Sequence, residues 1–183
     1  MVDPDIDLLN AVGRGEHGAF EILVTKYQGP ILNFIARYTG DRYMAEDIAQ
    51  EVFLRIYRAA PRFQAKTKAS TWIFRIAYNQ ALTEMGRQKR QRSLCEAIIR
   101  SKVSSDKESL AQPDDRLEFE EEIASAIGKL PDNQRAALLL RVNEDLSYRE
   151  IAEVLDVSVQ SVESLLFRAR TSIRKYLDKI RKG

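Results

Sequence analysis

Residues 62–92 carry the side chains best suited to binding a nucleic acid. Glu84 is the only acid there, against eight bases: Arg62, Lys66, Lys68, Arg75, Arg87, Lys89, Arg90 and Arg92. The stretch also holds the aromatic residues Phe63, Trp72, Phe74 and Tyr78. Cations attract phosphates, and aromatic faces stack on unpaired bases, so this combination favours a strand that is at least partly single. The alternative is that Trp72, Ile73 and Ile76 form plain core beside a solvated basic helix end.

Residues 147–170 have the pattern of two helices joined by a sharp turn. Ser147 and Glu150 have the spacing of a capping box, Asp156 tolerates a left-handed turn, and Ser158 can cap the second helix. The inward stripe of that helix is Val159, Val162, Leu166, Ala169 and Ile173. The outward side shows Gln160, Ser164 and Arg168. This pattern is typical of a helix-turn-helix that enters the DNA major groove, and the alternative is a hairpin that only packs.

Other classes of function find little support in the composition. The chain has one cysteine, Cys95, and one histidine, His17, so it offers no disulfide and no Cys/His metal pattern. No nucleophile–base set or carboxylate cluster indicates an enzyme acting on nucleic acid. The acidic N-terminus lacks a signal-peptide pattern, and no apolar run approaches a membrane span. We therefore expect a cytoplasmic protein that is not an enzyme, binds no metal or cofactor and does not insert into a membrane.

The rest of the chain has helical spacing of apolar residues and no convincing strand pattern. Helices are predicted near 6–12, over 16–38, and from an Asp41 cap to Arg58, with Gly29-Pro30 kinking or dividing the second. Ser70 or Thr71 can cap a fourth helix that ends in the basic run 86–92. Helices resume near Leu117 and include 133–142. The expected fold class is all-α, with two small helical domains joined by a flexible linker.

Charge and composition place that linker. Residues 1–92 carry a net charge of +4, residues 93–122 a net −5, and residues 123–183 a net +3. Residues 93–117 contain five serines and Pro113 and lose the helical periodicity, apart from a possible turn at 96–99. Two basic blocks separated by an acidic middle suit two nucleic-acid-binding domains and a linker that does not bind.

Three stretches, in this order, resemble the extracytoplasmic-function group of the sigma-70 family. They are AEDIAQEVFLRIYRA (45–59), STWIFRIAYNQAL (70–82) with the basic run after it, and 130–170, which contains LPDNQRAALLLRV and the helix-turn-helix. The resemblance implies a promoter-specificity subunit of RNA polymerase. It divides the chain into sigma region 2 (1–92), a linker (93–117) and sigma region 4 (118–183). The implied partners are core RNA polymerase, promoter DNA and an anti-sigma protein.

The resemblance also implies roles for individual residues. One set, the clamp face, would bind the polymerase: Asp47, Gln50, Glu51 and Arg55. A second set, the −10 surface, would melt and read the −10 element: Phe63, Lys66, Lys68, Trp72, Arg75, Asn79, Arg87, Lys89, Arg90 and Arg92. The loop 62–69 matches the one that captures a flipped base, and an amide such as that of Asn79 can pair with a base edge. A third set, the reading face, would contact the −35 element: Ser158, Gln160, Ser161, Glu163, Ser164, Arg168 and Arg170.

Several residues depart from the family pattern. Gln160-Ser161 replaces a common Gly-Thr, and Glu163 and Leu165 stand where relatives often carry a base. A carboxylate can accept from cytosine and leucine can touch a thymine methyl, so we expect an unusual −35 preference. Thr83 and Glu84 replace an Asp common near there, which leaves the −10 sequence open. The runner-up function is a free-standing helix-turn-helix regulator, which explains 147–170 but assigns no role to 45–59 or 62–92.

Overall fold

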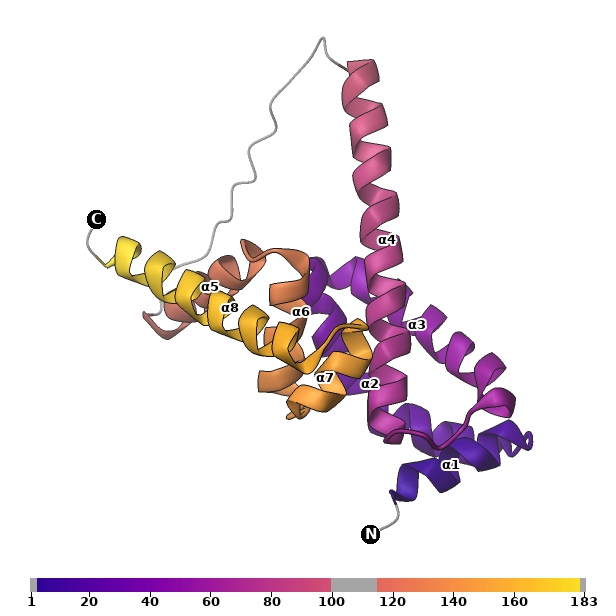
Figure 1. Ribbon diagram of the computed structural model, residues 1–183. Helices are drawn as coiled ribbons and strands as arrows, with labels where there is room; N and C mark the ends of the chain where they lie inside the picture. The colour runs from indigo at the N-terminus through magenta and orange to yellow at the C-terminus, as the bar shows by residue number, and fades with distance from the viewer. Residues whose placement is uncertain (1–2, 100–114, 182–183) are drawn as a thin grey trace.

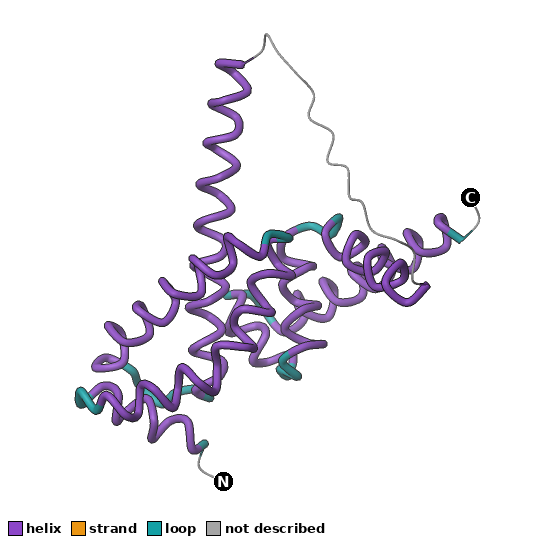
Figure 2. Tube along the Cα trace, turned by 180° about the vertical axis from the view of Figure 1, so that it is seen from behind, coloured by secondary structure: helices purple, strands orange, loops and turns teal. Residues whose placement is uncertain are grey.

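The computed structural model describes residues 3–99 and 115–181, and within them it shows helices and no strand. In chain order these are α1 (Pro4–Gly13), α2 (His17–Thr39), α3 (Arg42–Ala59), a 3-10 turn (Ala60–Arg62), α4 (Ala69–Ile99), α5 (Asp115–Gly128), α6 (Asp132–Asn143), α7 (Tyr148–Leu155) and α8 (Val159–Ile180). The all-α prediction is confirmed. Figure 1 shows α1 and α3 on one side of α4 and α5–α8 on the other, and both Figures 1 and 2 show the C-terminal part of α4 rising away from the body. Helix α2 passes behind α4 and packs against α1 and α3 as well as against α6.

Local capping signals fold as the sequence predicts. Asp41 accepts a hydrogen bond from the Met44 N–H at 3.0 Å and starts α3. The Ser147–Glu150 capping box is present at α7. Asp156 has φ 55°, in the left-handed region, and Ser158 accepts from the Ser161 N–H at the start of α8. The short polar side chains thus fix both helices of the helix-turn-helix and the turn between them.

Three local predictions fail. Pro30 lies inside α2, which stays undivided because proline removes only one helical hydrogen bond and buried residues on both sides keep their packing. The predicted division is therefore wrong, and the alternative of a kink there stays a prediction. Helix α4 begins at Ala69, so Ser70 and Thr71 lie within it; its cap is Asp3, whose Oδ2 accepts from the Ala69 N–H at 2.9 Å. Helix α4 also runs to Ile99, past residue 92, and α5 begins at Asp115, so both enter the predicted linker. Residues 100–114 of that linker lie outside the described residues.

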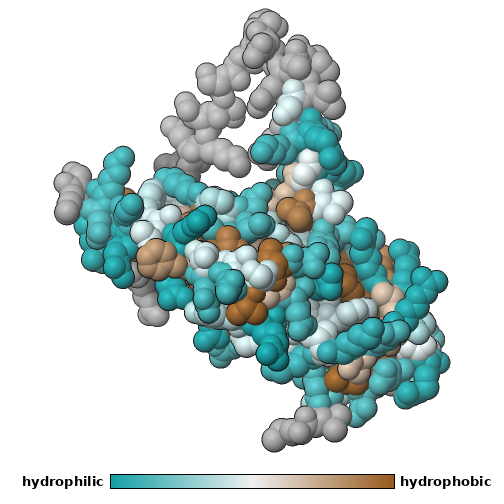
Figure 3. All heavy atoms as spheres, viewed as in Figure 1, coloured by the Kyte–Doolittle hydropathy of each residue, from teal (hydrophilic) through white to brown (hydrophobic). Residues whose placement is uncertain are grey.

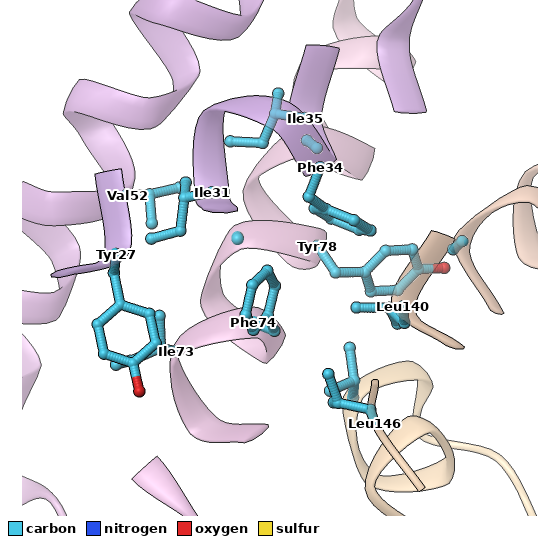
Figure 4. Packing of buried hydrophobic residues seen from close by; sticks show 14 of the residues in the cluster. Tyr27, Ile31, Phe34, Ile35, Val52, Ile73, Phe74, Tyr78, Leu140 and Leu146 are labelled. Atoms are coloured by element: carbon cyan, nitrogen blue, oxygen red, sulfur yellow. The ribbon is translucent and has the colours of Figure 1, made fainter. Parts of the chain in front are cut away.

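The hydrophobic core is continuous across the two predicted domains. In α2–α4 it contains Ile31, Phe34 and Phe74, and the same cluster includes Leu140 and Leu146 from the second half. Figure 4 shows the Tyr78 ring of α4 directed at Leu140. The Tyr78 hydroxyl donates to Asn133 Oδ1 of α6 at 3.0 Å. The two halves therefore pack as one body in this structure.

Arg135 of α6 is the buried charge at this junction. Its guanidinium donates to the carbonyl oxygens of Gly128 and Leu130 at 2.5 and 3.0 Å, and to that of Ile127 at 3.2 Å. It also donates to the Tyr38 carbonyl at 2.7 Å, across the junction. Three of these carbonyls lie at the C-terminal ends of α5 and α2, where helices leave oxygens unpaired and carry partial negative charge, and that of Leu130 lies in the turn after α5. The Arg135 side chain thus donates hydrogen bonds at the ends of both helices.

A close backbone approach joins α1 to the segment that leads to residues 63–68. A Cβ built on Gly13 would lie 2.8 Å from the Ala60 carbonyl oxygen and 3.3 Å from the Pro61 Cα. Both neighbours are backbone atoms, which cannot rotate away as a side chain can. Gly13 is therefore required by space, and the end of α1 fixes where the 3-10 turn crosses it.

Asp3, near the N-terminus, is expected to stabilise the start of α4, although it lies 66 positions away in the sequence. Asp3→Ala removes the acceptor for the Ala69 N–H and for the Asp5 N–H, and should lower the free energy of unfolding by about 1–2 kcal/mol. Asp3→Asn keeps an acceptor oxygen and should recover most of this loss. Urea denaturation measures the free energy of unfolding of both variants. Asp7→Ala, at an exposed position in the first turn of α1, is the control. Equal stabilities for Asp3→Ala and wild type would contradict the role of this cap.

Glu144 gives stability a pH dependence. Burial raises the pKa of Glu144 from 4.5 to about 7, so the folded chain holds this proton where the unfolded chain has lost it. Stability should therefore fall as pH rises from about 4.5 to about 7, by roughly 1–3 kcal/mol. Glu144→Gln should be more stable than wild type at pH 8 and nearly equal at pH 5 in urea titrations. Asp145→Asn, an exposed neighbour, is the control, and a pH-independent effect of Glu144→Gln would refute the assignment.

Candidate nucleic-acid interface

The clamp face forms a continuous strip along α3. Asp47, Gln50 and Arg55 are exposed and Glu51 is half-buried. Arg55 Nε donates to Glu51 Oε1 at 3.1 Å, one helical turn away. Sequence reasoning missed two large apolar side chains on the same helix, Tyr43 at 86% exposed and Leu54 at 48%. Residues 43, 47, 50, 51 and 54 are separated by three or four positions or are adjacent, so they share one helix face.

Asn79 lines a hollow ringed by arginines. The hollow has a volume of about 410 Å³, and its walls are formed by Arg55, Arg58, Ala59, Arg62, Ile76 and Asn79. Residues 55–62 come from the end of α3 and the 3-10 turn, and Ile76 and Asn79 from α4. From the sequence, Arg55 was assigned to the clamp face and Arg62 to the basic stretch 62–92, whereas Arg58 was assigned no role. The structure places Arg55 between the clamp face and Asn79, and it adds Arg58 and Arg62 to the surroundings of the amide.

The four aromatic residues singled out in the stretch 62–92 divide into two groups. Phe63 and Trp72 are half-buried and pack edge to face, with ring centroids 5.1 Å apart. Phe74 and Tyr78 are 2% and 4% exposed, so the idea that they offer faces to unpaired bases is wrong. Positions 74, 77, 78 and 81 follow the inward stripe of α4, and their burial is decided by that spacing. Only Phe63 and Trp72 keep ring surface near solvent.

The basic residues of the −10 surface also separate along α4. Lys66, Lys68 and Arg75 are exposed near its start. Arg87, Lys89 and Arg90 are exposed on the part that rises from the body, where Arg87 Nε donates to Glu84 Oε1 at 2.9 Å. Arg92 lies in α4, and its side chain is outside the described residues. The −10 surface therefore contains two basic patches, one near the loop 63–68 and one farther along α4, on the part that rises from the body.

The reading face is the exposed side of α8. Ser158, Gln160, Ser161, Glu163, Ser164, Arg168 and Arg170 are all exposed. Some are engaged locally: Ser158 caps α8, Ser164 Oγ donates to the Gln160 carbonyl at 3.1 Å, and Arg170 donates to the Tyr148 hydroxyl at 3.3 Å. Gln160, Glu163 and Arg168 are the longer side chains free to extend from this face.

The apolar residues of α8 differ from expectation in three places. Val159 is 40% exposed rather than inward, because it is the first residue of the helix and precedes the packed turns. Leu165 is half-buried and packs against the core, so its contact with a thymine methyl is not supported. Phe167 is 71% exposed beside Arg168 and is the outward apolar side chain instead. Sequence reasoning missed it because the helical stripe alone does not tell which border residues are covered.

The −10 surface and the helix-turn-helix face each other. A second hollow, of about 580 Å³, has walls from both: Lys66, Thr67 and Arg75 on one side, and residues of α7 and the turn, including Asp156 and Ser158, on the other. Lys68 Nζ lies 2.7 Å from Glu150 Oε1 of α7. The arrangement thus brings candidate residues of the −10 surface against the start of the reading face, and Asn79 opens onto a separate hollow.

Two other kinds of site are not found among the described residues. Across residues 3–99 and 115–181, no three His, Cys, Asp or Glu side chains gather as metal ligands would. Within the same ranges, no helix combines the length and apolarity that crossing a membrane requires. On the face that Figure 3 presents, the surface is mostly hydrophilic, with small scattered hydrophobic patches.

Comparisons with known proteins cover both halves of the chain. Residues 23–91 match the family Sigma-70 region 2, and residues 120–173 match Sigma-70, region 4. The RNA polymerase sigma-H factor of Pseudomonas aeruginosa is 38% identical over 182 residues, covering 96% of this chain and 94% of that protein. The ECF RNA polymerase sigma-E factor of Escherichia coli K12 is 33% identical over 175 residues, covering 91% and 90%.

Solved structures agree in fold over most of the chain. CnrH, solved in complex with the cytosolic domain of CnrY, has a TM-score of 0.72 and 27% identity, covering 97% of this chain and 99% of that one. The sigma factor RpoE of Bartonella quintana, solved with the anti-sigma factor NepR, has a TM-score of 0.70 at 18% identity, covering 87% and 96%. With both family regions matched in order and relatives above 30% identity over nearly the full length, the chain belongs to the extracytoplasmic-function group of the sigma-70 family of RNA polymerase sigma factors.

Proposed function

We propose that this chain binds core RNA polymerase and directs initiation at promoters through a −10 and a −35 element. The observation that carries the proposal is the exposed Asn79 amide in a hollow ringed by Arg55, Arg58 and Arg62. An amide can donate to and accept from one base edge, and guanidiniums hold the phosphates on either side of that base. The hollow therefore offers both parts of the recognition of a single-stranded −10 element.

The −10 element is opened by the same end of region 2. Extruding a base from the duplex costs a few kcal/mol of stacking and pairing, which protein contacts must offset. Asn79 and Ile76 offer contacts to the base, the half-buried pair of Phe63 and Trp72 lies at the loop 63–68, and Lys66 and Lys68 supply charge. The basic residues farther along α4 extend this charge along the strand without reading its sequence.

The −35 element is read by α8 in the major groove. Gln160 at the start of the helix and Arg168 two turns later are exposed and reach the same side. Gln pairs with adenine and Arg with guanine, whereas Glu163 accepts from cytosine. Phe167 supplies an apolar contact for a thymine methyl, the role first considered for Leu165.

The clamp face binds the polymerase, and its chemistry indicates the partner surface. Asp47, Gln50 and Glu51 present acceptor oxygens, with Leu54 as an exposed apolar centre. Such a face fits a basic helical surface with an apolar seam. We also propose regulation by an anti-sigma protein that contacts both halves. Two structures similar to this chain, CnrH and RpoE, were solved with a bound protein, which supports that proposal.

Run-off transcription with core polymerase over a promoter library tests the function as a whole. Initiation at a defined subset of promoters that depends on this chain is the expected result. A free-standing regulator would bind DNA without entering polymerase. Co-purification with core polymerase therefore separates the two functions, and failure to associate with core would refute the sigma assignment.

Replacing Asp47, Gln50 and Glu51 together by Ala should abolish binding to core polymerase. Two of the three side chains are exposed and the third is half-buried, so the helix content by circular dichroism should not change. Pull-down with core polymerase measures the effect. Glu16, Glu21 and Gln28 to Ala, on the exposed side of α1–α2, is the matched control and should bind as wild type. A clamp-face triple variant that co-purifies at wild-type yield would show that α3 is not the polymerase contact.

Asn79→Ala and the basic run should differ in what they change. Asn79→Ala should reduce open-complex formation and relax preference at one −10 position, by about 1–3 kcal/mol of discrimination. Changing Arg87, Lys89, Arg90 and Arg92 to Gln should weaken binding to all promoters alike, and should reduce the salt slope by about 0.7–0.9 for each phosphate that is no longer neutralised. Filter binding over a salt series, with promoter variants at each −10 position, separates the two effects. An unchanged slope would show that these side chains do not contact phosphate.

A further inference from the structure

Opposite charges lie close together where the −10 surface meets the helix-turn-helix. Lys68, of the −10 surface, pairs with Glu150 of α7, and Arg75 pairs with Asp156 in the turn. Arg75 and Asp156 line the hollow of about 580 Å³ together with Lys66, Thr67 and Arg149. In both pairs the cation comes from region 2 and the carboxylate from region 4. The acids thus occupy the positions in which a nucleic-acid backbone would meet the −10 surface.

Lys68 and Glu150 form the closer pair. Their N–O distance is 2.7 Å, and the side chain of Glu150 is only 12% exposed while that of Lys68 is 66% exposed. Burial works to raise the pKa of Glu150, but hydrogen bonds from Lys68 and Ser147 outweigh it and hold the pKa below its ordinary value. The hydrogen bond with Glu150 in turn raises the pKa of Lys68. Both groups are therefore charged at neutral pH.

Arg75 and Asp156 form a looser pair. Arg75 Nη2 and Asp156 Oδ1 are 3.9 Å apart, and the aspartate side chain is 91% exposed. The left-handed backbone of Asp156 turns the chain there and directs the carboxylate at the hollow's rim. Water and salt screen such a pair, so it contributes less than the first. Its geometry nevertheless repeats the same match of a region 2 cation with a region 4 acid.

We propose that Glu150 and Asp156 act as internal mimics of promoter phosphates and compete with DNA for Lys68 and Arg75 when the chain is free. A carboxylate offers ammonium and guanidinium groups the same kind of charged acceptor oxygens as a phosphate. The inference rests on the proposed function of the −10 surface. It adds that the surface is masked by this chain's own helix-turn-helix, before any other protein binds.

Glu150 and Asp156 compete with DNA at a junction between the two halves that is held together mainly by other contacts. The apolar packing of Tyr78 against Leu140 and Leu146 and the Arg135 hydrogen bonds bring the halves together, and the acids decide how well DNA competes at the rim. Two partly exposed ion pairs should shift that competition by about two- to tenfold. Because charge carries the effect, it should shrink as salt rises.

The test uses the full chain with Glu150→Gln and Asp156→Asn together. Gln retains the acceptor of the capping box, and Asn tolerates the left-handed backbone, so both variants keep local structure and remove charge. The probe is a pool of single-stranded DNA oligonucleotides randomised at the −10 positions, measured by fluorescence anisotropy with the free chain. We expect the double variant to bind two- to tenfold more tightly than wild type at low salt, with the gain falling as salt rises. Glu150→Gln alone should give most of the gain.

A control separates mimicry from general charge. Asp7→Asn with Glu21→Gln makes the same change of +2 at exposed sites on α1 and α2, and should alter binding little. Equal gains in both double variants, or no gain in the Glu150/Asp156 variant, would overturn the proposal. With core polymerase added, the variant and wild type should bind the pool alike, because the mimic must be displaced to use the surface. Holoenzyme that fails to bind promoter or initiate would instead refute the proposed function, whatever the free chain does.

Discussion

The buried guanidinium of Arg135 is the interaction on which the arrangement of the two halves depends. Removing a charge from water is costly, and the offset here comes from four carbonyl oxygens, three at the ends of α5 and α2 and one in the turn after α5. Three of those carbonyls belong to region 4, so Arg135 fixes the turn between α5 and α6 whether or not region 2 is present. The fourth, that of Tyr38, ties that turn to α2.

This asymmetry limits how many hydrogen bonds of Arg135 would be lost if promoter binding, as proposed, required the halves to separate. On opening, the guanidinium keeps three of its four partners and exchanges one hydrogen bond for water. The aromatic group of Tyr38, Tyr78 and Phe34 stays with region 2, where centroids 5.8–5.9 Å apart keep the rings packed together. Separation would expose the packing of α4 against α7 and of α2 against α5 and α6, which includes Tyr78 near Leu140, together with a few polar pairs.

The success of sequence reasoning follows the range of the interactions involved. The Asp41 cap, the Ser147–Glu150 box and the left-handed Asp156 depend on residues within a few positions, and the structure confirms them. The cap of α4 comes from Asp3, which lies 66 positions away, so no local pattern could reveal it. In the sequence, Arg135 looks like any other basic residue of a helix. Its acceptors are backbone carbonyls, which every residue has, so no residue type in the sequence indicates them. The site residues were predicted as a set from their motifs and stay predictions, whereas the grouping of the arginines around Asn79 becomes visible only where α3 and α4 cross.

Gly13 makes one region of the chain unusually intolerant of sequence change. A side chain there would press on Ala60 and Pro61, and these lead directly into Arg62 and Phe63. In a saturation mutagenesis screen scored by promoter opening, most substitutions at residue 13 would therefore be lost, although that residue is on neither the clamp face nor the −10 surface. Genetic mapping alone would thus misidentify Gly13 as a residue that contacts DNA. Second-site suppressors would be expected as substitutions to smaller residues in the 3-10 turn rather than at DNA-facing positions.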